Sequence, residues 1–267
     1  MQFDRGEWKV EDQVGGYRLT RRTSDIHVQR FILNERGIGK EMDPAFYDLV
    51  AGKRVAIVGP LDFDKDYWQE IDAFDLKVEL NPLTTRRAQI TEKYSGKPDI
   101  AYYNGKNGND QLAVNYRDLY TDAKYIVFKE QQHVANLRNK LKVRRFIPNY
   151  TLPYNGSFKM VENIVMDLNL CDVAEIKVYG TDMTLNTGYS KSYVRRTIDA
   201  NSLYRTRVGH DIFTQFNFMR KAQELGYVSG DDRLTRILNL SVQQYATEIE
   251  ENYPVPYYSE YISDDQS

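Results

Sequence analysis

Short apolar runs that end in glycine or asparagine recur along the chain and predict the buried strands of a parallel sheet. The first covers residues 54–58, Arg-Val-Ala-Ile-Val, and is followed by Gly59 and a helix-length segment. Strands buried on both faces read as continuous apolar runs, and a helix returns the chain between them. Similar runs cover residues 76–80, 100–104, 125–129, 145–148 and 175–180.

Apolar residues at three- and four-residue steps predict the helices between these runs. The strongest stripe lies in residues 158–170 and continues to Cys171. Weaker patterns predict a helix or turn at residues 68–74 and helices at 111–119, 134–142, 211–225 and 234–251. Strands that alternate with helices in this way predict an α/β fold, with one Rossmann-like, mostly parallel sheet and helices on both faces.

Composition divides the chain into three parts. Residues 1–48 are polar and mixed, and predict an N-terminal extension with a short strand or hairpin near residues 15–20. Residues 49–252 carry the alternating elements and predict one domain, in which residues 181–209 form a polar, mobile loop. Residues 253–267 are expected to be an acidic C-terminal tail.

Charge and cysteine content exclude some classes of protein. The formal net charge of −2 gives no overall field that gathers nucleic acid, so nucleic acid is not an expected partner. The single cysteine, Cys171, lies in an apolar helical stripe and reads as a small core residue that forms no internal disulfide. No apolar run approaches the length of a membrane span, and nothing resembles a signal peptide. We therefore expect a cytoplasmic protein.

Four predicted strands end in residues that suit a nucleotide site: Gly59, Asn81, Asn104 and Gly180. The carboxyl ends of parallel strands meet at one edge of the sheet, where open α/β folds bind their ligands. An asparagine amide both donates and accepts hydrogen bonds, which suits a ribose, a pyrimidine edge or a phosphate oxygen. Each of these residues alone is explained by a turn, because glycine and asparagine are common in turns. The prediction of a site rests on their shared location at one edge of the sheet.

Two further features point to chemistry at this edge. The turn Asn155-Gly156-Ser157 precedes the strongest helix, whose free backbone N–H groups can bind an anion or simply receive a cap. His210 follows the polar loop and opens a helix. A neutral imidazole in that position could take a proton from an attacking hydroxyl, although a lone histidine is more often structural.

The acidic pair in Asp62-Phe63-Asp64 has two readings. Carboxylates in this pattern hold Mg²⁺ or Mn²⁺ in many transferases that use nucleotide sugars. Capping of the following helix explains the pair at least as well, so we do not predict a metal site here.

Taken together, these motifs resemble the sialyltransferase family of CMP-sugar-dependent glycosyltransferases, which includes the animal enzymes and distant microbial and viral relatives. The similar segments are residues 55–59, 71–81, 98–104, 155–180 and 210–228. The first two are similar to the start and end of the family's large motif, and the third to its next strand. The fourth is similar to the small motif, with a helix that ends in Leu-Cys-Asp and a strand that ends in Val-Tyr-Gly. The last is similar to the short His-x4-Glu motif.

The resemblance implies a metal-independent, inverting glycosyltransferase with the GT-A-like variant of the fold that sialyltransferases have. It implies a CMP-activated sugar donor, a glycan or other hydroxyl acceptor, and no separate cofactor. It also implies that Asn81, Asn104 and the Asn155-Gly156-Ser157 turn contact CMP, and that His210 is the base that activates the acceptor.

The chain departs from the family in several ways. Pro60-Leu61-Asp62 stands where the family has an asparagine at the phosphate, and a carboxylate there is unfavourable unless it is screened. Gln215 replaces the glutamate of the last motif, and Cys171 has no partner for the family's disulfide. Two alternatives therefore stay open: a non-catalytic nucleotide- or glycan-binding protein on the same scaffold, and a Mg²⁺-dependent transferase that uses Asp62 and Asp64.

Overall fold

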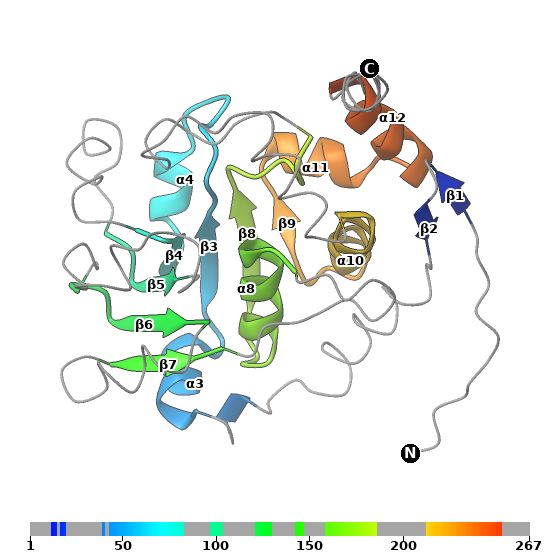
Figure 1. Cartoon of the computed structure of the whole chain (residues 1–267). Helices are drawn as coiled ribbons and strands as arrows, with labels where there is room; N and C mark the ends of the chain where they lie inside the picture. The colour runs from blue at the N-terminus through cyan, green and yellow to red at the C-terminus, as the bar shows by residue number, and fades with distance from the viewer. Residues whose placement is uncertain are drawn as a thin grey trace, which may run out of the picture.

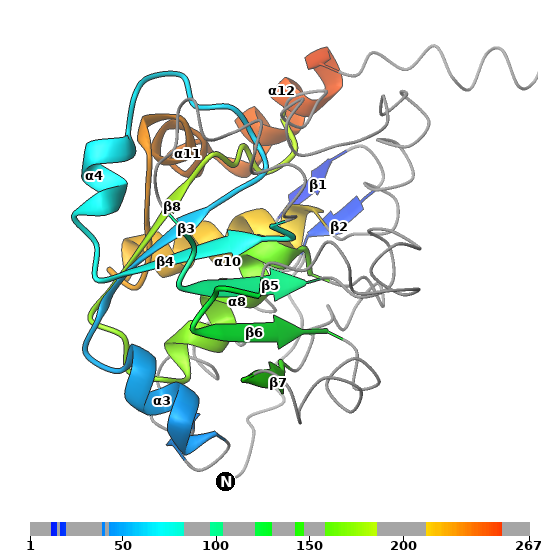
Figure 2. The ribbon, with the colours of Figure 1, turned by 90° about the vertical axis from the view of Figure 1, so that its left-hand side faces the viewer.

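A seven-stranded sheet forms the centre of the molecule in a computed structural model of the chain (Figures 1 and 2). The structure describes residues 12–14, 17–19, 39–40, 43–82, 97–103, 121–129, 142–146, 158–185 and 212–252. The strands are β3 (Arg54–Val58), β4 (Leu76–Leu80), β5 (Ile100–Tyr103), β6 (Tyr125–Phe128), β7 (Val143–Arg145), β8 (Glu175–Tyr179) and β9 (Ser229–Gly230). Their order is β7-β6-β5-β4-β3-β8-β9, and every neighbouring pair is parallel. The predicted α/β fold is confirmed.

Helices cover both faces of the central strands, as the continuous apolar runs predicted. The helices are α3 (Pro44–Val50), α4 (Trp68–Asp72), α8 (Met160–Asn169), α10 (Ile212–Glu224), α11 (Asp232–Leu238) and α12 (Val242–Asn252). Successive side chains of a strand point to opposite faces. Val55 and Ile57 of β3 accordingly join the larger core with α8 and α10, whereas Ala56 joins a smaller core with Ile71 of α4.

The structure confirms the strongest helical patterns and corrects two weaker ones. Helices α8 and α10 lie within the predicted ranges. The helix predicted for residues 234–251 is wrong as a single element, because residues 239–241 separate α11 from α12. The strand predicted at residues 145–148 begins earlier, as β7. The helices predicted at residues 111–119 and 134–142 lie outside the described residues.

The N-terminal part contains a hairpin and a helix. Strands β1 (Asp12–Val14) and β2 (Tyr17–Leu19) pair antiparallel, which confirms the predicted hairpin. Helix α3 was not predicted from the sequence, and its Phe46 and Val50 are fully buried in the larger core. Asp43 caps this helix by accepting a hydrogen bond from the Phe46 N–H at 3.0 Å. The division of the chain at residues 48 and 252 stays a prediction.

A buried ion pair joins α8 to the edge strand β7. The Arg144 guanidinium donates two hydrogen bonds to the Asp167 carboxylate, at 2.5 and 2.9 Å, and both side chains are less than a tenth exposed. Tyr102 of β5 donates a third hydrogen bond to Asp167 at 2.6 Å. The guanidinium also lies 4.2 Å from the centre of the Phe46 ring and 3.4 Å from the Asp43 carboxylate. The pair thus connects α3, β5, β7 and α8.

The single cysteine has the structural role that the sequence predicted. Cys171 lies in the larger core just after α8, with 1% of its surface exposed. Burial raises the pKa of its thiol to about 12, so the thiolate needed for nucleophilic chemistry is not formed near neutral pH. None of the helices in the described ranges has the length and apolar character that crossing a membrane requires.

Candidate functional site

The candidate site lies at the point where the strand order of the sheet reverses. Beginning at β3, the chain adds β4, β5, β6 and β7 on one side and then returns to add β8 and β9 on the other. Ligands of open α/β sheets bind beyond the carboxyl ends of the strands at such a point. Gly59 directly follows β3 and Gly180 directly follows β8, so the structure brings these two predicted residues together.

Gly59 and Gly180 allow the loops that follow β3 and β8 to pack directly on each other. The Gly59 N–H donates to the Tyr179 carbonyl at 2.7 Å, and the Leu61 N–H donates to the Gly180 carbonyl at 2.9 Å. A Cβ atom at position 59 would lie 2.4 Å from the Gly180 oxygen. Gly180 has a φ of +65°, and a Cβ there would lie 2.8 Å from the Leu61 oxygen. Both positions therefore require glycine.

We expect Gly180→Ala to lower the free energy of unfolding by roughly 2–4 kcal/mol, because it adds both left-handed strain and a backbone clash. Gly226→Ala is the matched control. Gly226 also has a positive φ, +76°, but a Cβ there meets nothing within 4 Å. The control should cost only about 1 kcal/mol. Urea unfolding of both variants measures the difference, and equal costs would show that the Gly180–Leu61 contact does not constrain the loop.

Asn81 lies at the same edge, at the end of β4 beside β3. Its backbone is left-handed, with a φ of 45°, and its N–H donates to the Tyr102 carbonyl at 2.7 Å. Asparagine is one of the few residues that adopt this conformation readily. The following residue, Pro82, is held by the Tyr103 hydroxyl, which donates to its carbonyl at 2.6 Å. Asn81 thus forms a turn at the carboxyl end of β4, on the sheet edge where the sequence places it.

The other predicted site residues lie outside the described residues: Asn104, Asn155, Gly156, Ser157 and His210. The described elements beside them are β5, α8 and α10. The carboxyl end of β5 lies at the same edge of the sheet as that of β4, since the two strands are parallel. Helices α8 and α10 each lead into a parallel strand, β8 and β9, so each begins near that edge.

A buried glutamine connects the beginnings of α8 and α10. The Gln215 side chain, 1% exposed, accepts a hydrogen bond from the Lys159 N–H at 2.8 Å through its Oε1 atom. Asn163 donates from its Nδ2 atom to the Phe158 and Lys159 carbonyls at 2.8 and 2.9 Å. A neutral amide satisfies the Lys159 N–H without adding charge at this helix start. The sequence marked Gln215 only as a departure from a motif; its partner 56 positions away was not predictable.

The segment Asp62-Phe63-Asp64 contacts the start of α11 through Arg233. Arg233 donates to the Asp62 carbonyl at 3.0 Å, and its Nε atom lies 3.9 Å from the Asp64 carboxylate. The Phe63 ring packs against Tyr67, Trp68 and Tyr179, with its centre 4.7 Å from that of Trp68. In the part of the chain that the structure describes, no three His, Cys, Asp or Glu side chains are grouped to hold a metal ion.

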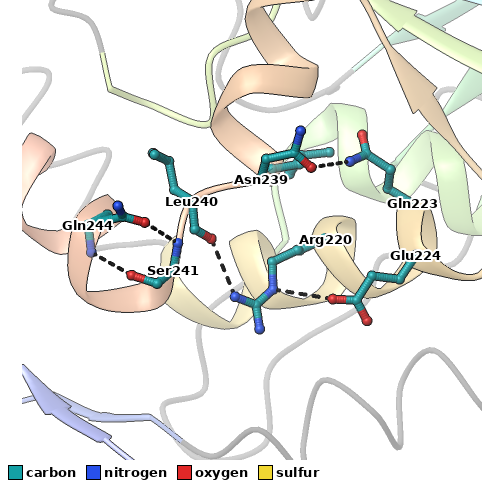
Figure 3. Close-up of a pocket in the computed structure, with 8 residues that line it drawn as sticks. Arg220, Gln223, Glu224, Asn239, Leu240, Ser241 and Gln244 are labelled. Atoms are coloured by element: carbon teal, nitrogen blue, oxygen red, sulfur yellow. Dashed lines mark hydrogen bonds and ion pairs between the residues drawn. The ribbon is translucent and has the colours of Figure 1, made fainter.

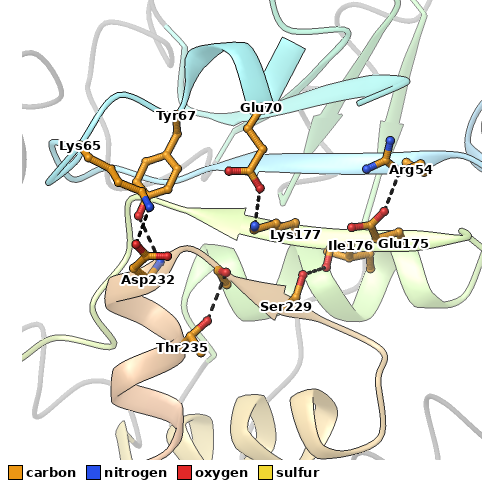
Figure 4. A network of polar contacts seen from close by, with 11 residues as sticks. Arg54, Lys65, Tyr67, Glu70, Glu175, Ile176, Lys177, Ser229, Asp232 and Thr235 are labelled. Atoms are coloured by element: carbon orange, nitrogen blue, oxygen red, sulfur yellow. Dashed lines mark hydrogen bonds and ion pairs between the residues drawn. The ribbon is translucent and has the colours of Figure 1, made fainter. Parts of the chain in front are cut away.

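Polar contacts fix the same loop and α4 over β8 and α11 (Figure 4). Lys65 pairs with Asp232 at 2.5 Å, and the Asp232 N–H donates to the Tyr67 hydroxyl at 3.2 Å. Lys177 of β8 pairs with Glu70 of α4. Leu61, Asp62 and Lys65 all form contacts with the end of β8 or with α11, and these contacts hold the loop in place.

The loop after β8 is buried, which corrects part of the prediction for residues 181–209. Thr181, Asp182, Met183 and Leu185 are all less than a tenth exposed, and residues 186–209 lie outside the described residues. Met183 and Thr184 have left-handed backbones, with φ values of 49° and 72°. The Tyr245 hydroxyl of α12 donates to the Met183 carbonyl and helps to hold this conformation. Strain of this kind gathers at functional sites, and no signal in the sequence announces it.

A cavity of about 550 Å³ lies away from this edge, between the end of α10 and the α11–α12 junction (Figure 3). Its side chains pair largely with one another. Arg220 lies 3.8 Å from Glu224, and Gln223 donates to Asn239 at 3.4 Å. None of the site residues predicted from the sequence lines this cavity.

The comparisons with known proteins found similar chains only among solved structures. No family model matches the sequence, and no curated protein is significantly similar to it. Among solved structures, a mammalian sialyltransferase in complex with Gal-beta-1-3GalNAc-ortho-nitrophenol matches 86% of this chain and 92% of its own, at 11% identity and a TM-score of 0.43. Another mammalian sialyltransferase structure matches 85% of this chain and 81% of its own, with the same identity and TM-score. A similarity at this level does not define an activity.

Proposed function

We propose that the chain is an inverting glycosyltransferase that transfers an acidic sugar, sialic acid or a Kdo-like ulosonic acid, from a CMP-activated donor to a hydroxyl acceptor. The observation that carries the proposal is the reversal of strand order at β3 and β8, which places Gly59, Gly180 and Asn81 at the carboxyl ends of β3, β8 and β4. Ligands of open α/β sheets bind at this position. The resemblance of the motifs to sialyltransferases supplies the class of ligand.

The elements at this edge of the sheet differ in the groups that they offer to a phosphate. On the β8 side, the Leu61 N–H is already bound to the Gly180 carbonyl, and Asp62 lies against Arg233. This side of the edge therefore offers few hydrogen-bond donors to an anion. Helix α8, which leads into β8, begins near the same edge, and its N-cap residue Lys159 forms no side-chain cap hydrogen bond. We therefore assign the CMP phosphate to the α8 side, where helix N–H groups favour negative charge.

In the proposed reaction, the acceptor oxygen attacks the anomeric carbon of the donor sugar. The bond from that carbon to the phosphate oxygen breaks, and CMP leaves with the bonding electrons. The His210 imidazole takes the proton of the acceptor hydroxyl. Asn81 and Asn104 hold cytidine, and the backbone N–H groups of Gly156 and Ser157 stabilise the leaving phosphate.

Thermal unfolding with a panel of nucleotides tests this function. We expect CMP at about 100 times its dissociation constant to raise Tm by roughly 5 °C or more, and UDP and GDP to have no effect. Release of CMP from a CMP-sugar in the presence of an acceptor would then establish transfer. Stabilisation by UDP that EDTA abolishes would contradict the proposal and favour a metal site at Asp62 and Asp64. Binding of CMP without any turnover would favour the non-catalytic alternative.

A further inference from the structure

A buried carboxyl group lies in the first turn of α8, at the helix start assigned to phosphate. Glu162 is 2% exposed, and its Oε2 atom has no hydrogen-bond partner among the described residues. A buried carboxyl oxygen without a partner is costly, and such atoms in native proteins call for an explanation. Nothing in the proposed reaction uses Glu162.

The geometry directs this carboxyl toward the start of the helix. Side chains of an α-helix lean toward its N-terminus. The backbone N–H of Glu162 itself interacts with the carboxyl and favours its charged form, so the group lies on the side to which the first N–H groups point. The helix has 10 residues, and the side chain of its N-cap residue, Lys159, forms no cap hydrogen bond. The carboxyl thus lies where an anion bound to α8 would lie.

The charges around Glu162 are few. Burial raises the pKa of this carboxyl, and the Lys159 ammonium on the same turn opposes that effect. The α10 side chain that reaches this turn, Gln215, is neutral. Among the described residues, Lys159 is the side chain whose charge acts on Glu162.

We propose that the Glu162 carboxyl occupies the anion position at the start of α8, and that a ligand phosphate binds there together with uptake of one proton by Glu162. Two negative groups cannot share the position, whereas a neutral carboxylic acid can donate a hydrogen bond to a phosphate oxygen. Binding of the phosphate therefore becomes weaker as the pH rises and Glu162 ionises. For a nucleotide, this inference rests on the proposed function.

The test is calorimetric titration of the wild type and of Glu162→Gln with CMP, in buffers of different ionisation enthalpy. The wild type is expected to take up a proton that the variant does not. Protonation of the CMP phosphate itself is common to both proteins and cancels in the comparison. The ratio of the two dissociation constants should grow with pH, by up to about tenfold per unit, in favour of the variant. Glu250→Gln, on the exposed surface of α12, is the matched control and should behave as the wild type.

The stability of the unliganded protein gives a second readout. Because folding raises the pKa of Glu162, the folded state binds a proton more tightly than the unfolded state. Wild-type stability should therefore fall as the pH rises above about 4.3. Glu162→Gln should remove this loss and raise Tm at neutral pH.

The possible outcomes separate the inference from the proposed function. Equal proton uptake in the wild type and Glu162→Gln would overturn the inference while leaving CMP binding intact. If neither protein binds CMP, the proposed function fails. The same titrations with inorganic phosphate then test the anion site independently of CMP. Phosphate binding with proton uptake supports the site, and absence of phosphate binding overturns it.

Discussion

Replacing Arg144 by methionine is expected to lower the free energy of unfolding by about 3–5 kcal/mol, because it leaves the Asp167 carboxylate buried without its cation. Both side chains lie almost wholly inside the protein, and the pair forms two hydrogen bonds. The Tyr102 hydroxyl remains as a partner for Asp167, but it supplies no positive charge. Urea unfolding followed by circular dichroism measures the loss.

Two controls separate the buried charge from the loss of an arginine in general. Arg236 pairs with Glu248 through two similar hydrogen bonds, but its side chain is 56% exposed. Arg236→Met should therefore cost no more than about 1 kcal/mol. The double variant Arg144→Met with Asp167→Leu should lose less than the two single variants together, since it leaves no unpaired charge. A cost for Arg144→Met as small as that for Arg236→Met would contradict this account.

The parts of the fold that could be predicted are those specified by local patterns. The apolar run of β3 and the stripe of α8 each occupy one continuous segment, so their elements follow from the sequence. Helix α3 has seven residues, which is too short for a clear periodic stripe, although Asp43 and Pro44 mark its start. The break between α11 and α12 also had a signal. Ser241 and Gln244 cap each other reciprocally, at 2.8 and 3.1 Å, as the spacing Ser-x-x-Gln allows.

The candidate site could be predicted only as a set of positions. Parallel strands bring Gly59, Asn81 and Gly180 to one edge, and this follows from topology alone. The contacts at this edge join segments far apart in the chain, and no local pattern encodes them. Gln215 accepts from Lys159, and Leu61 donates to Gly180. The sequence flagged Pro60-Leu61-Asp62 as a departure, and the structure supplies a physical reason: this segment packs on the end of β8 and on Arg233.

Replacing His210 by alanine is expected to lower the rate of sugar transfer by about 10²–10⁴-fold, the usual contribution of a general base. The proposed role of His210 is to remove the proton of the acceptor hydroxyl, so the loss should fall mainly on kcat. Binding of CMP should change little, because the base does not hold the donor. CMP release from a CMP-sugar with acceptor present, together with CMP titration of the same variant, measures both quantities.

The pH profile distinguishes a base from a residue that merely supports the fold. A histidine base acts in its neutral form, so wild-type activity should fall as the pH is lowered and the imidazole takes up a proton, and this acidic limb should be absent from the residual activity of His210→Ala. His27→Ala and His133→Ala are the matched controls, since the sequence shows no partner pattern around either residue. Both should keep the wild-type rate and profile. If His210→Ala keeps them as well, the base is a different residue. A loss of CMP affinity and of Tm with the pH limb retained would instead assign His210 a structural role.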